Sequence, residues 1–329
     1  MTDAAGGLAV DDLTITIAGA AVVDGVGVAV APGQVLALVG ESGCGKSLTA
    51  FALLGLLPDA ARVTRGRIAL DGRDLTGLSD RAWRGVRGRD ISIIFQEPTA
   101  SLDPLATVGA QVAEAYRLHN RVGRAEARGK ARAMLDAVGI PDPDRRLDQY
   151  PFELSGGMCQ RVMIAIALIC GPRILVADEP TTALDVTIQA QILDLMRRLR
   201  DERGMGIVLI THDMGVVADV ADRVAVMYAG RIAELAPVEA LFARPYHPYT
   251  ALLLASVPRL DAAPKADLAT IEGSVPAPAE FGEGCRFAGR CPLADPRCVA
   301  EAPPLAEWRP GHRAACWHAE AAAGLARAA

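Results

Sequence analysis

The sequence predicts an α/β protein built around a buried parallel β-sheet. Three short apolar runs support this prediction: "QVLALV" at residues 34–39, "RILVAD" at 173–178 and "GIVLIT" at 206–211. Nearly continuous apolar runs are typical of strands that are covered on both faces, as in parallel sheets. Because the carboxyl ends of parallel strands face a common ligand crevice, we expect the residues that follow these runs to form a site together.

The first run leads into "GESGCGKS" at residues 40–47, and no proline follows until Pro58, which predicts a helix of about three turns. This loop fits G-x-x-x-x-G-K-[ST], in which glycines let backbone N–H groups point at phosphate oxygens beside a helix N-terminus. Lys46 is expected to reach the β- and γ-phosphates of a nucleoside triphosphate, and Ser47 to ligate Mg²⁺. An ordinary glycine-rich turn is the alternative, which the flanking strand and helix disfavour. The residues expected to contact the nucleotide are Gly40, Glu41, Ser42, Gly43, Cys44, Gly45, Lys46, Ser47 and Leu48.

The second run ends in two adjacent acids, Asp178 and Glu179. Both would project toward the phosphates from a strand end. We expect Asp178 to hold Mg²⁺, directly or through water, and Glu179 to polarise the attacking water. An apolar run that ends in two acids is common by itself, so this assignment depends on the glycine-rich loop.

A second element suited to anions lies at Ser155, Gly156 and Gly157, which open a predicted helix with apolar residues at helical spacing. The exposed N–H groups of a helix start attract anions. Taken alone, the tripeptide is better explained as the serine cap of an ordinary helix. With the glycine-rich loop, one chain contains two elements able to face phosphate.

Composition limits the possible partners. The chain has 329 residues, of which 51% are hydrophobic, enough for about two domains. A net charge of -5 without a basic block argues against nucleic-acid binding and against direct adsorption to membranes. The longest apolar stretch, residues 162–170, is too short to span a bilayer, and the acidic N-terminus does not resemble a secretory signal. Membrane association is therefore expected to come through a partner.

Together these motifs resemble the ATP-binding cassette (ABC) ATPases. "LSGGMCQR" resembles their signature motif, with Met158 where glutamine is usual, and "IIFQEP", "TTALD" and "LITHD" resemble the Q-loop, D-loop and switch motifs. The resemblance covers about residues 8–240. It implies that Gln96 ligates Mg²⁺ and takes part in catalysis, that Asp185 contacts the nucleotide site, and that His212 contacts the γ-phosphate.

The resemblance also implies a fold and a mode of assembly. The fold would be a P-loop NTPase cassette with a parallel core sheet, an antiparallel β portion and a helical signature subdomain at about residues 100–170. The cassette would occupy residues 1–258, and a linker with a small cysteine-containing extension would occupy residues 259–329. Two such chains, identical or homologous, would pair head to tail, so that the signature of one closes on ATP and Mg²⁺ bound by the other.

Within this family the stretches "HPYTALLLASVPRL" and "GCRFAGRCPLADPRC" resemble the ATPases of oligopeptide, dipeptide and nickel importers. The resemblance implies ATP hydrolysis that drives uptake of di- and oligopeptides through two integral-membrane permease subunits, with an extracytoplasmic binding protein. The chain would lie peripherally on the cytoplasmic face of the membrane. Import of a nickel or other metal complex is the alternative. A soluble ABC ATPase of repair or translation is the alternative from another class, and the acidic single cassette disfavours it.

One departure from the family concerns the base of the nucleotide. Many cassettes stack an aromatic residue on adenine ahead of the phosphate loop, but the first aromatic residue here is Phe51. Ile17 or its neighbours would then offer an apolar face instead.

Four of the seven cysteines, Cys285, Cys291, Cys298 and Cys316, are spaced C-x₅-C-x₆-C-x₁₇-C near the end of the chain. Four thiolates could hold a [4Fe–4S] cluster or a tetrahedral zinc ion, and a small loop-rich tail would gain stability from either. The spacing matches neither a zinc ribbon nor the usual ferredoxin pattern. Reduced cysteines that pack the extension are an equal alternative, and His318 is a further candidate ligand.

Overall fold

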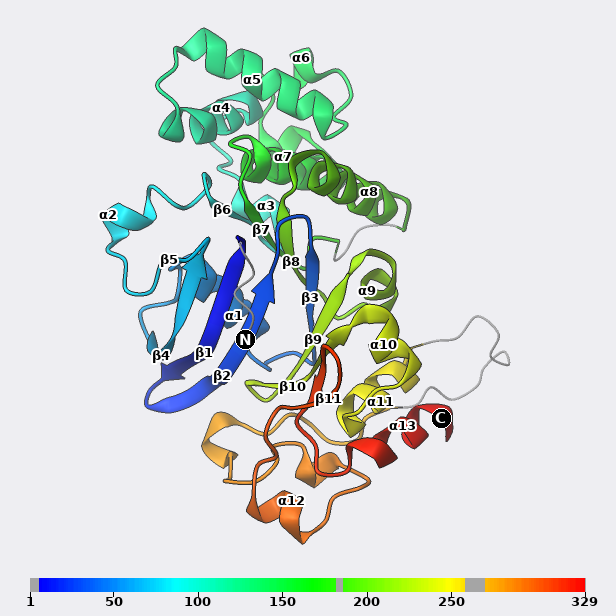
Figure 1. The fold of residues 1–329 in the computed structure, drawn as a ribbon. Helices are drawn as coiled ribbons and strands as arrows, with labels where there is room; N and C mark the ends of the chain where they lie inside the picture. Colours follow the sequence, from blue (N-terminus) through cyan, green and yellow to red (C-terminus); the bar gives the residue numbers. More distant parts are fainter. Residues whose placement is uncertain (1–5, 182–185, 258–269, 329) are drawn as a thin grey trace.

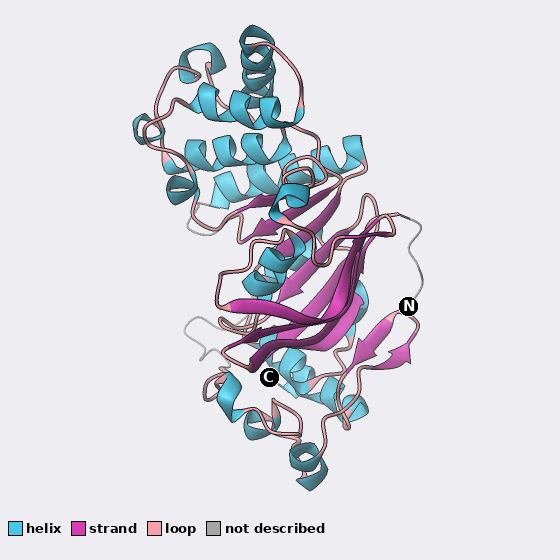
Figure 2. Ribbon diagram, turned by 90° about the vertical axis from the view of Figure 1, so that its left-hand side faces the viewer, coloured by secondary structure: helices cyan, strands magenta, loops and turns pink. Residues whose placement is uncertain are grey.

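The computed structural model describes residues 6–181, 186–257 and 270–328. Two sheets lie in the middle of the molecule, a group of helices lies at one end, and the C-terminal segments lie at the other (Figures 1 and 2). Asp185 falls outside the described residues. None of the described helices is long and apolar enough to cross a membrane.

The larger sheet has eight strands in the order β11-β12-β10-β9-β3-β8-β7-β6. Neighbours from β9 to β6 run parallel, and the other three pairs are antiparallel. The three apolar runs are confirmed as parallel neighbours within it. Its strands are β3 (Val35–Val39), β6 (Ile91–Ile94), β7 (Ile174–Asp178), β8 (Gly206–Ile210), β9 (Arg223–Tyr228), β10 (Arg231–Pro237), β11 (Ala306–Arg309) and β12 (His312–Ala314).

The smaller sheet is antiparallel, with the order β2-β1-β4-β5. Its strands are β1 (Leu8–Ile17), β2 (Ala20–Val30), β4 (Ala61–Leu70) and β5 (Arg73–Asp74). β2 and β4 flank β1 on either side, so β1 is an interior strand of this sheet. The side chains of Leu13 and Ile15 are buried from solvent.

Helices cover the larger sheet and form the group at one end of the molecule, where α4, α5 and α7 pack together (Figure 1). The α-helices are α1 (Lys46–Leu53), α2 (Asp80–Trp83), α3 (Pro98–Ser101), α4 (Val108–His119), α5 (Arg124–Ala137), α6 (Pro143–Arg146), α7 (Gly156–Leu168), α8 (Val186–Arg203), α9 (Met214–Val220), α10 (Val238–Ala243), α11 (Pro248–Ala255), α12 (Pro296–Ala300) and α13 (Ala319–Ala328). Short 3₁₀ turns are η1 (Pro151–Glu153), η2 (Pro278–Glu280) and η3 (Ala288–Arg290).

The helix after the glycine-rich loop is shorter than the three turns expected from the sequence. α1 has eight residues and ends at Leu53. Gly55 follows in the left-handed conformation, with φ of 61°, and the N–H of Leu56 donates to the carbonyl of Phe51. This is the Schellman arrangement by which a glycine ends a helix, so the helix stops before Pro58 is reached.

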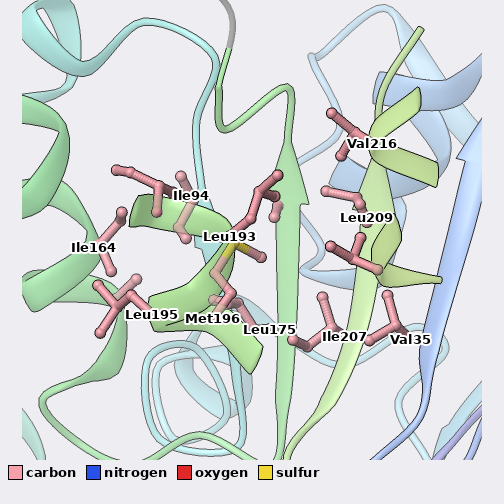
Figure 3. Packing of buried hydrophobic residues seen from close by; sticks show 14 of the residues in the cluster. Val35, Ile94, Ile164, Leu175, Leu193, Leu195, Met196, Ile207, Leu209 and Val216 are labelled. Carbon is pink, nitrogen blue, oxygen red and sulfur yellow. The ribbon is translucent and has the colours of Figure 1, made fainter. Parts of the chain in front are cut away.

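Apolar side chains fix the sheet against its helices. Leu175 and Ile207 of neighbouring strands are buried with Leu193 and Met196 of α8 (Figure 3). A close-packed interface of this kind leaves the strand ends little freedom to move. The loops that leave those ends are therefore held in fixed positions relative to one another.

The C-terminal residues join the larger sheet through β12, which pairs with β10. The buried carboxylate of Glu234 accepts hydrogen bonds from the backbone N–H groups of Tyr246 (2.7 Å) and His247 (3.0 Å) and lies 2.6 Å from Nε2 of the buried His312. One side chain thus joins β10, the start of α11 and β12. A buried carboxylate needs several such partners to offset its loss of water.

Candidate nucleotide site

Four predicted site segments meet at one edge of the larger sheet. The glycine-rich loop follows β3, Gln96 follows β6, Glu179 follows β7 and His212 follows β8, and these strands are mutually parallel. All four segments line one cavity of about 380 Å³. The parallel topology is the reason that residues far apart in sequence reach the same place.

The glycine-rich loop depends on two glycines in particular. Gly40 has φ of 149°, and a Cβ atom there would lie 2.2 Å from the carbonyl oxygen of Met227. Gly45 has φ of 102° and precedes the first residue of α1. Only glycine adopts these conformations without strain, and the resulting turn aims the N-terminus of α1 into the cavity.

Lys46 begins α1 and its side chain is buried. Its Nζ donates to the carbonyl oxygens of Gly40 (2.7 Å) and Glu41 (2.9 Å), so the ammonium group lies within the turn of the loop. This is the position from which a cation can meet phosphate oxygens held by the same turn. Cys44 is buried beneath the loop, and its side chain is absent from the cavity lining.

Asp178 ends β7 with its carboxyl group buried, and its Oδ1 has no hydrogen-bond partner. Burial raises the pKa of this carboxyl, and the Glu179 carboxylate raises it further, whereas a Ser47 hydrogen bond and the Lys46 charge lower it. An unpartnered buried carboxylate oxygen beside a serine hydroxyl is a donor set that suits Mg²⁺, which prefers hard oxygen ligands. The residues therefore fit this ion.

Glu179 lies between two other predicted catalytic residues. Gln96 donates from Nε2 to one carboxylate oxygen of Glu179 (3.2 Å), and Nδ1 of His212 lies 3.1 Å from the other. Glu179 has φ of 48°, a left-handed conformation that is uncommon outside glycine and occurs at sites where geometry is constrained by function. The structure thus places these three predicted residues in one cluster.

The signature element lies elsewhere. Ser155 caps α7, its Oγ accepting from the N–H of Met158 (3.4 Å). Ser155 and Gly156 are exposed, and neither they nor Gly157 line the cavity that contains Lys46. Within this chain the two predicted phosphate-facing elements are therefore separate.

Comparison with known proteins identifies the family. The ABC transporter family model matches residues 23–182, and the model described as "Oligopeptide/dipeptide transporter, C-terminal region" matches residues 233–298. The chain is 54% identical over 302 residues to a probable peptide ABC transporter ATP-binding protein, y4tR, of Sinorhizobium fredii, a match that covers 92% of this chain and 90% of the relative. The chain belongs to the ATP-binding subunits of ABC transporters.

Two further matches agree with this assignment. The dipeptide transport ATP-binding protein DppD of Bacillus subtilis is 52% identical over 286 residues, which are 87% of this chain and 85% of DppD. Among solved structures, a dimeric post-hydrolysis state of the cassette MJ0796 bound to ADP and phosphate is 26% identical. That match has a TM-score of 0.63 and covers 70% of this chain and 98% of the other. This ABC subunit therefore has the fold and the motifs of an ATP-hydrolysing cassette.

Part of the cavity lining was not expected from the sequence of this ABC subunit. Ile17 is absent from the lining, whereas Val22 of β2 and three residues from the C-terminal part of the chain, Pro276, Pro278 and Phe281, are part of it. An aromatic side chain therefore lies at the cavity, although none precedes the loop in sequence. Sequence reasoning missed Phe281, because no motif connects it to the loop.

The four late cysteines line one small cavity together with His318. The N–H of Leu293 donates to Sγ of Cys291 (3.4 Å), and the N–H of His318 donates to Sγ of Cys316 (3.3 Å). Burial raises the pKa of Cys291 to about 11 and that of Cys316 to about 12. Both thiols therefore keep their protons near neutral pH unless a cation replaces them.

Proposed function

We propose that this chain is an ATPase subunit of a peptide importer, which binds MgATP at the residue 40–47 loop and transmits the energy of hydrolysis to two membrane-spanning permease subunits. The cluster of Gln96, Glu179 and His212 at the edge of the sheet carries the hydrolytic part of the proposal. The match of residues 233–298 to the peptide-transporter C-terminal region supports the transport part.

Glu179 is proposed to orient and polarise the water that attacks the γ-phosphate. Its two carboxylate oxygens are engaged by different side chains, Gln96 and His212, which fixes the direction of the carboxylate. His212 is exposed enough to reach a γ-phosphate from its place after β8, whereas the Glu179 side chain is only 17% exposed. Lys46 and the N–H groups of the loop would hold the β- and γ-phosphates while charge develops on them.

Mg²⁺ would be held by Ser47, Asp178 and Gln96. Bound there, the ion neutralises charge on the β- and γ-phosphate oxygens. The unpartnered Oδ1 of Asp178 is the observation in favour of this ligand set.

We also propose that the signature acts on the site of a second subunit. Ser155 and Gly156 lie exposed at the start of α7, outside the cavity of their own chain. Two cassettes arranged head to tail would bring each signature to the phosphates of the other, and the cassette MJ0796 has been solved as a dimer. The partner can be a second copy of this chain or a homologous ATPase subunit.

The surface for the permeases is proposed to lie on the segment between the Q-loop and the signature. Among the described residues, five of the nine exposed large hydrophobic side chains fall between residues 95 and 152: Phe95, Leu105, Leu118, Tyr150 and Phe152. Exposed apolar side chains are a feature of protein interaction sites, and their number in this one segment of the chain is the reason for the proposal. Docking there would hold the chain peripherally on the cytoplasmic face of the membrane.

Di- and oligopeptides are the proposed cargo, received by the permeases from an extracytoplasmic binding protein. The relatives described above have names that refer to peptides or dipeptides, which favours peptides over a nickel complex. Uptake of a labelled dipeptide into liposomes containing the assembled transporter tests the proposal directly. We expect uptake to require ATP and to stop with Glu179→Gln but not with Glu202→Gln, an exposed control on α8. ATP-dependent uptake of nickel without uptake of peptide would contradict the choice of cargo.

The cysteine cavity is proposed to hold an iron–sulfur cluster rather than zinc. A Zn–S bond of about 2.3 Å places tetrahedral thiolates only ~3.8 Å apart. Among the described residues, the one group of three potential ligands within 4.8 Å of one another is Asp295, Cys298 and His318. No three of the four cysteines form such a group among the described residues. Thiolates that bind different irons of a cluster do not need to meet at one ion, so we favour a cluster.

Anaerobic purification followed by iron, sulfide and zinc analysis tests the cluster. We expect iron and acid-labile sulfide in equal amounts, and loss of both when the four cysteines become serine. A folded, metal-free extension, or stoichiometric zinc, would contradict the proposal.

A further inference from the structure

The base end of the nucleotide cavity is lined by residues that arrive from the C-terminal part of the chain. Among the lining residues, Phe281 is the one Phe, Tyr or Trp, and it lies with Pro276 and Pro278 far from the glycine-rich loop in sequence but in the same cavity. Val22 of β2 completes this apolar end. Phosphates bound at Lys46 would leave the base of the nucleotide to occupy the remaining apolar part. We call the part lined by the residue 40–47 loop, Gln96, Glu179 and His212 the phosphate end, and the part lined by Val22, Pro276, Pro278 and Phe281 the base end.

The Phe281 ring is held in place from behind. The guanidinium carbon of Arg286 lies 4.1 Å from the ring centroid, and the Arg286 side chain is only 7% exposed. Arg286 donates to Oδ2 of Asp24 (2.6 Å) and to the carbonyl oxygen of Ala229 (2.5 Å). Arg286 lines a neighbouring cavity and not the nucleotide cavity, so its guanidinium contacts the ring without entering the nucleotide cavity.

A second arginine attaches the same segment to the phosphate loop. Arg290 donates to both carboxylate oxygens of Glu41 (3.0 and 3.1 Å) and to the carbonyl oxygens of residues 271, 272 and 273. The Arg290 side chain is 9% exposed. The segment that ends in Phe281 is thus anchored at both ends, and one anchor is part of the loop that binds phosphate.

We propose that Phe281 stacks on the purine base of the bound nucleoside triphosphate, so that the C-terminal extension completes the nucleotide site of this subunit. The proposal rests on the nucleotide site of the proposed function. A flat ring already fixed by a cation on its far side loses little conformational freedom when a base covers its near side. Since stacking uses the face of the base and not its edge, Phe281 should serve adenine and guanine alike.

Calorimetric titration of the full chain with MgATP and with magnesium tripolyphosphate tests this role. Tripolyphosphate has the phosphates but neither ribose nor base. We expect Phe281→Ala to weaken ATP binding by about tenfold or more, in the range of base–aromatic stacking, and to leave tripolyphosphate binding unchanged. Phe242→Ala, which removes a partly exposed ring on α10 outside the cavity lining, is the matched control and should alter neither affinity.

Phe281→Trp provides a test that does not require removal of the ring. It should retain ATP affinity within about threefold of the wild type, and its added indole fluorescence should change with ATP but not with tripolyphosphate.

Unchanged ATP affinity in Phe281→Ala, or an equal loss of affinity for tripolyphosphate, would overturn the role of Phe281. An indole signal in Phe281→Trp that does not respond to ATP would overturn it as well. A wild-type chain that binds neither ligand would instead refute the nucleotide site itself.

Discussion

The two ends of the nucleotide cavity are built in different ways. The phosphate end is formed by a continuous loop, residues 40–47, and by residues that directly follow parallel strands. The base end combines Val22 of β2 with Phe281, which reaches the cavity only because the C-terminal residues pack against the cassette. Phosphate binding can therefore be encoded by short local motifs, whereas recognition of the base here depends on tertiary packing.

The largest expected effect is a loss of ATP hydrolysis when Glu179, at the phosphate end, is substituted. Glu179→Gln keeps the shape of the side chain but removes the carboxylate that polarises water, so ATP hydrolysis should slow by about 10²- to 10⁴-fold. ATP affinity should persist, because binding depends on the loop and the base end. Phosphate release and equilibrium binding, measured on the same preparation, separate the two quantities. Turnover within a few-fold of the wild type would remove Glu179 from this role.

Substitution of Lys46, the buried cation of the loop, is expected to have a smaller effect, which is on ligand affinity. Lys46→Ala removes a charged donor to phosphate, a type of hydrogen bond worth about 1.5–3 kcal/mol, so affinity for both ATP and tripolyphosphate should fall by about ten- to hundredfold. Lys130→Ala, an exposed lysine on α5, should change neither affinity. A Lys46→Ala variant that loses affinity for ATP but not for tripolyphosphate would mean that the two ends of the cavity are not separate in function.

The smallest expected effect is on ATP affinity when the contact between Arg290 and Glu41, which connects the two ends, is removed. Arg290→Met releases the segment before Phe281 from Glu41, so the segment must be ordered when nucleotide binds. Immobilising such a side chain costs about 0.5–1.5 kcal/mol, which predicts a two- to tenfold loss of ATP affinity and a smaller loss for tripolyphosphate. Arg89→Met, at an exposed position, is the matched control. Equal losses of affinity for ATP and tripolyphosphate would mean that Arg290 acts through the phosphate loop and not through the position of Phe281.

The sequence was sufficient to predict the phosphate end because each of its residues closely follows an apolar strand. Parallel topology then brings Gln96, Glu179 and His212 together without further information. The prediction of about three turns for α1 was wrong. Gly55 ended this helix earlier than the nearest proline suggested, since a left-handed glycine closes a helix as effectively.

The base end could not be predicted in the same way. Phe281 belongs to no periodic pattern and lies in a segment with prolines on its N-terminal side. Its position follows from ion pairs between Arg286 and Asp24 and between Arg290 and Glu41, each of which joins residues more than 200 positions apart. The sequence does show two arginines beside the cysteines in "CRFAGRC", but it does not indicate which residues these arginines contact.

The most direct test of the contrast between the two ends is an experimental structure of the Glu179→Gln variant with Mg²⁺ and ATP. We expect the triphosphate in the residue 40–47 loop, Mg²⁺ beside Ser47 and Asp178, and the adenine ring against Phe281. Adenine directed away from Phe281, or phosphates bound away from Lys46, would contradict it.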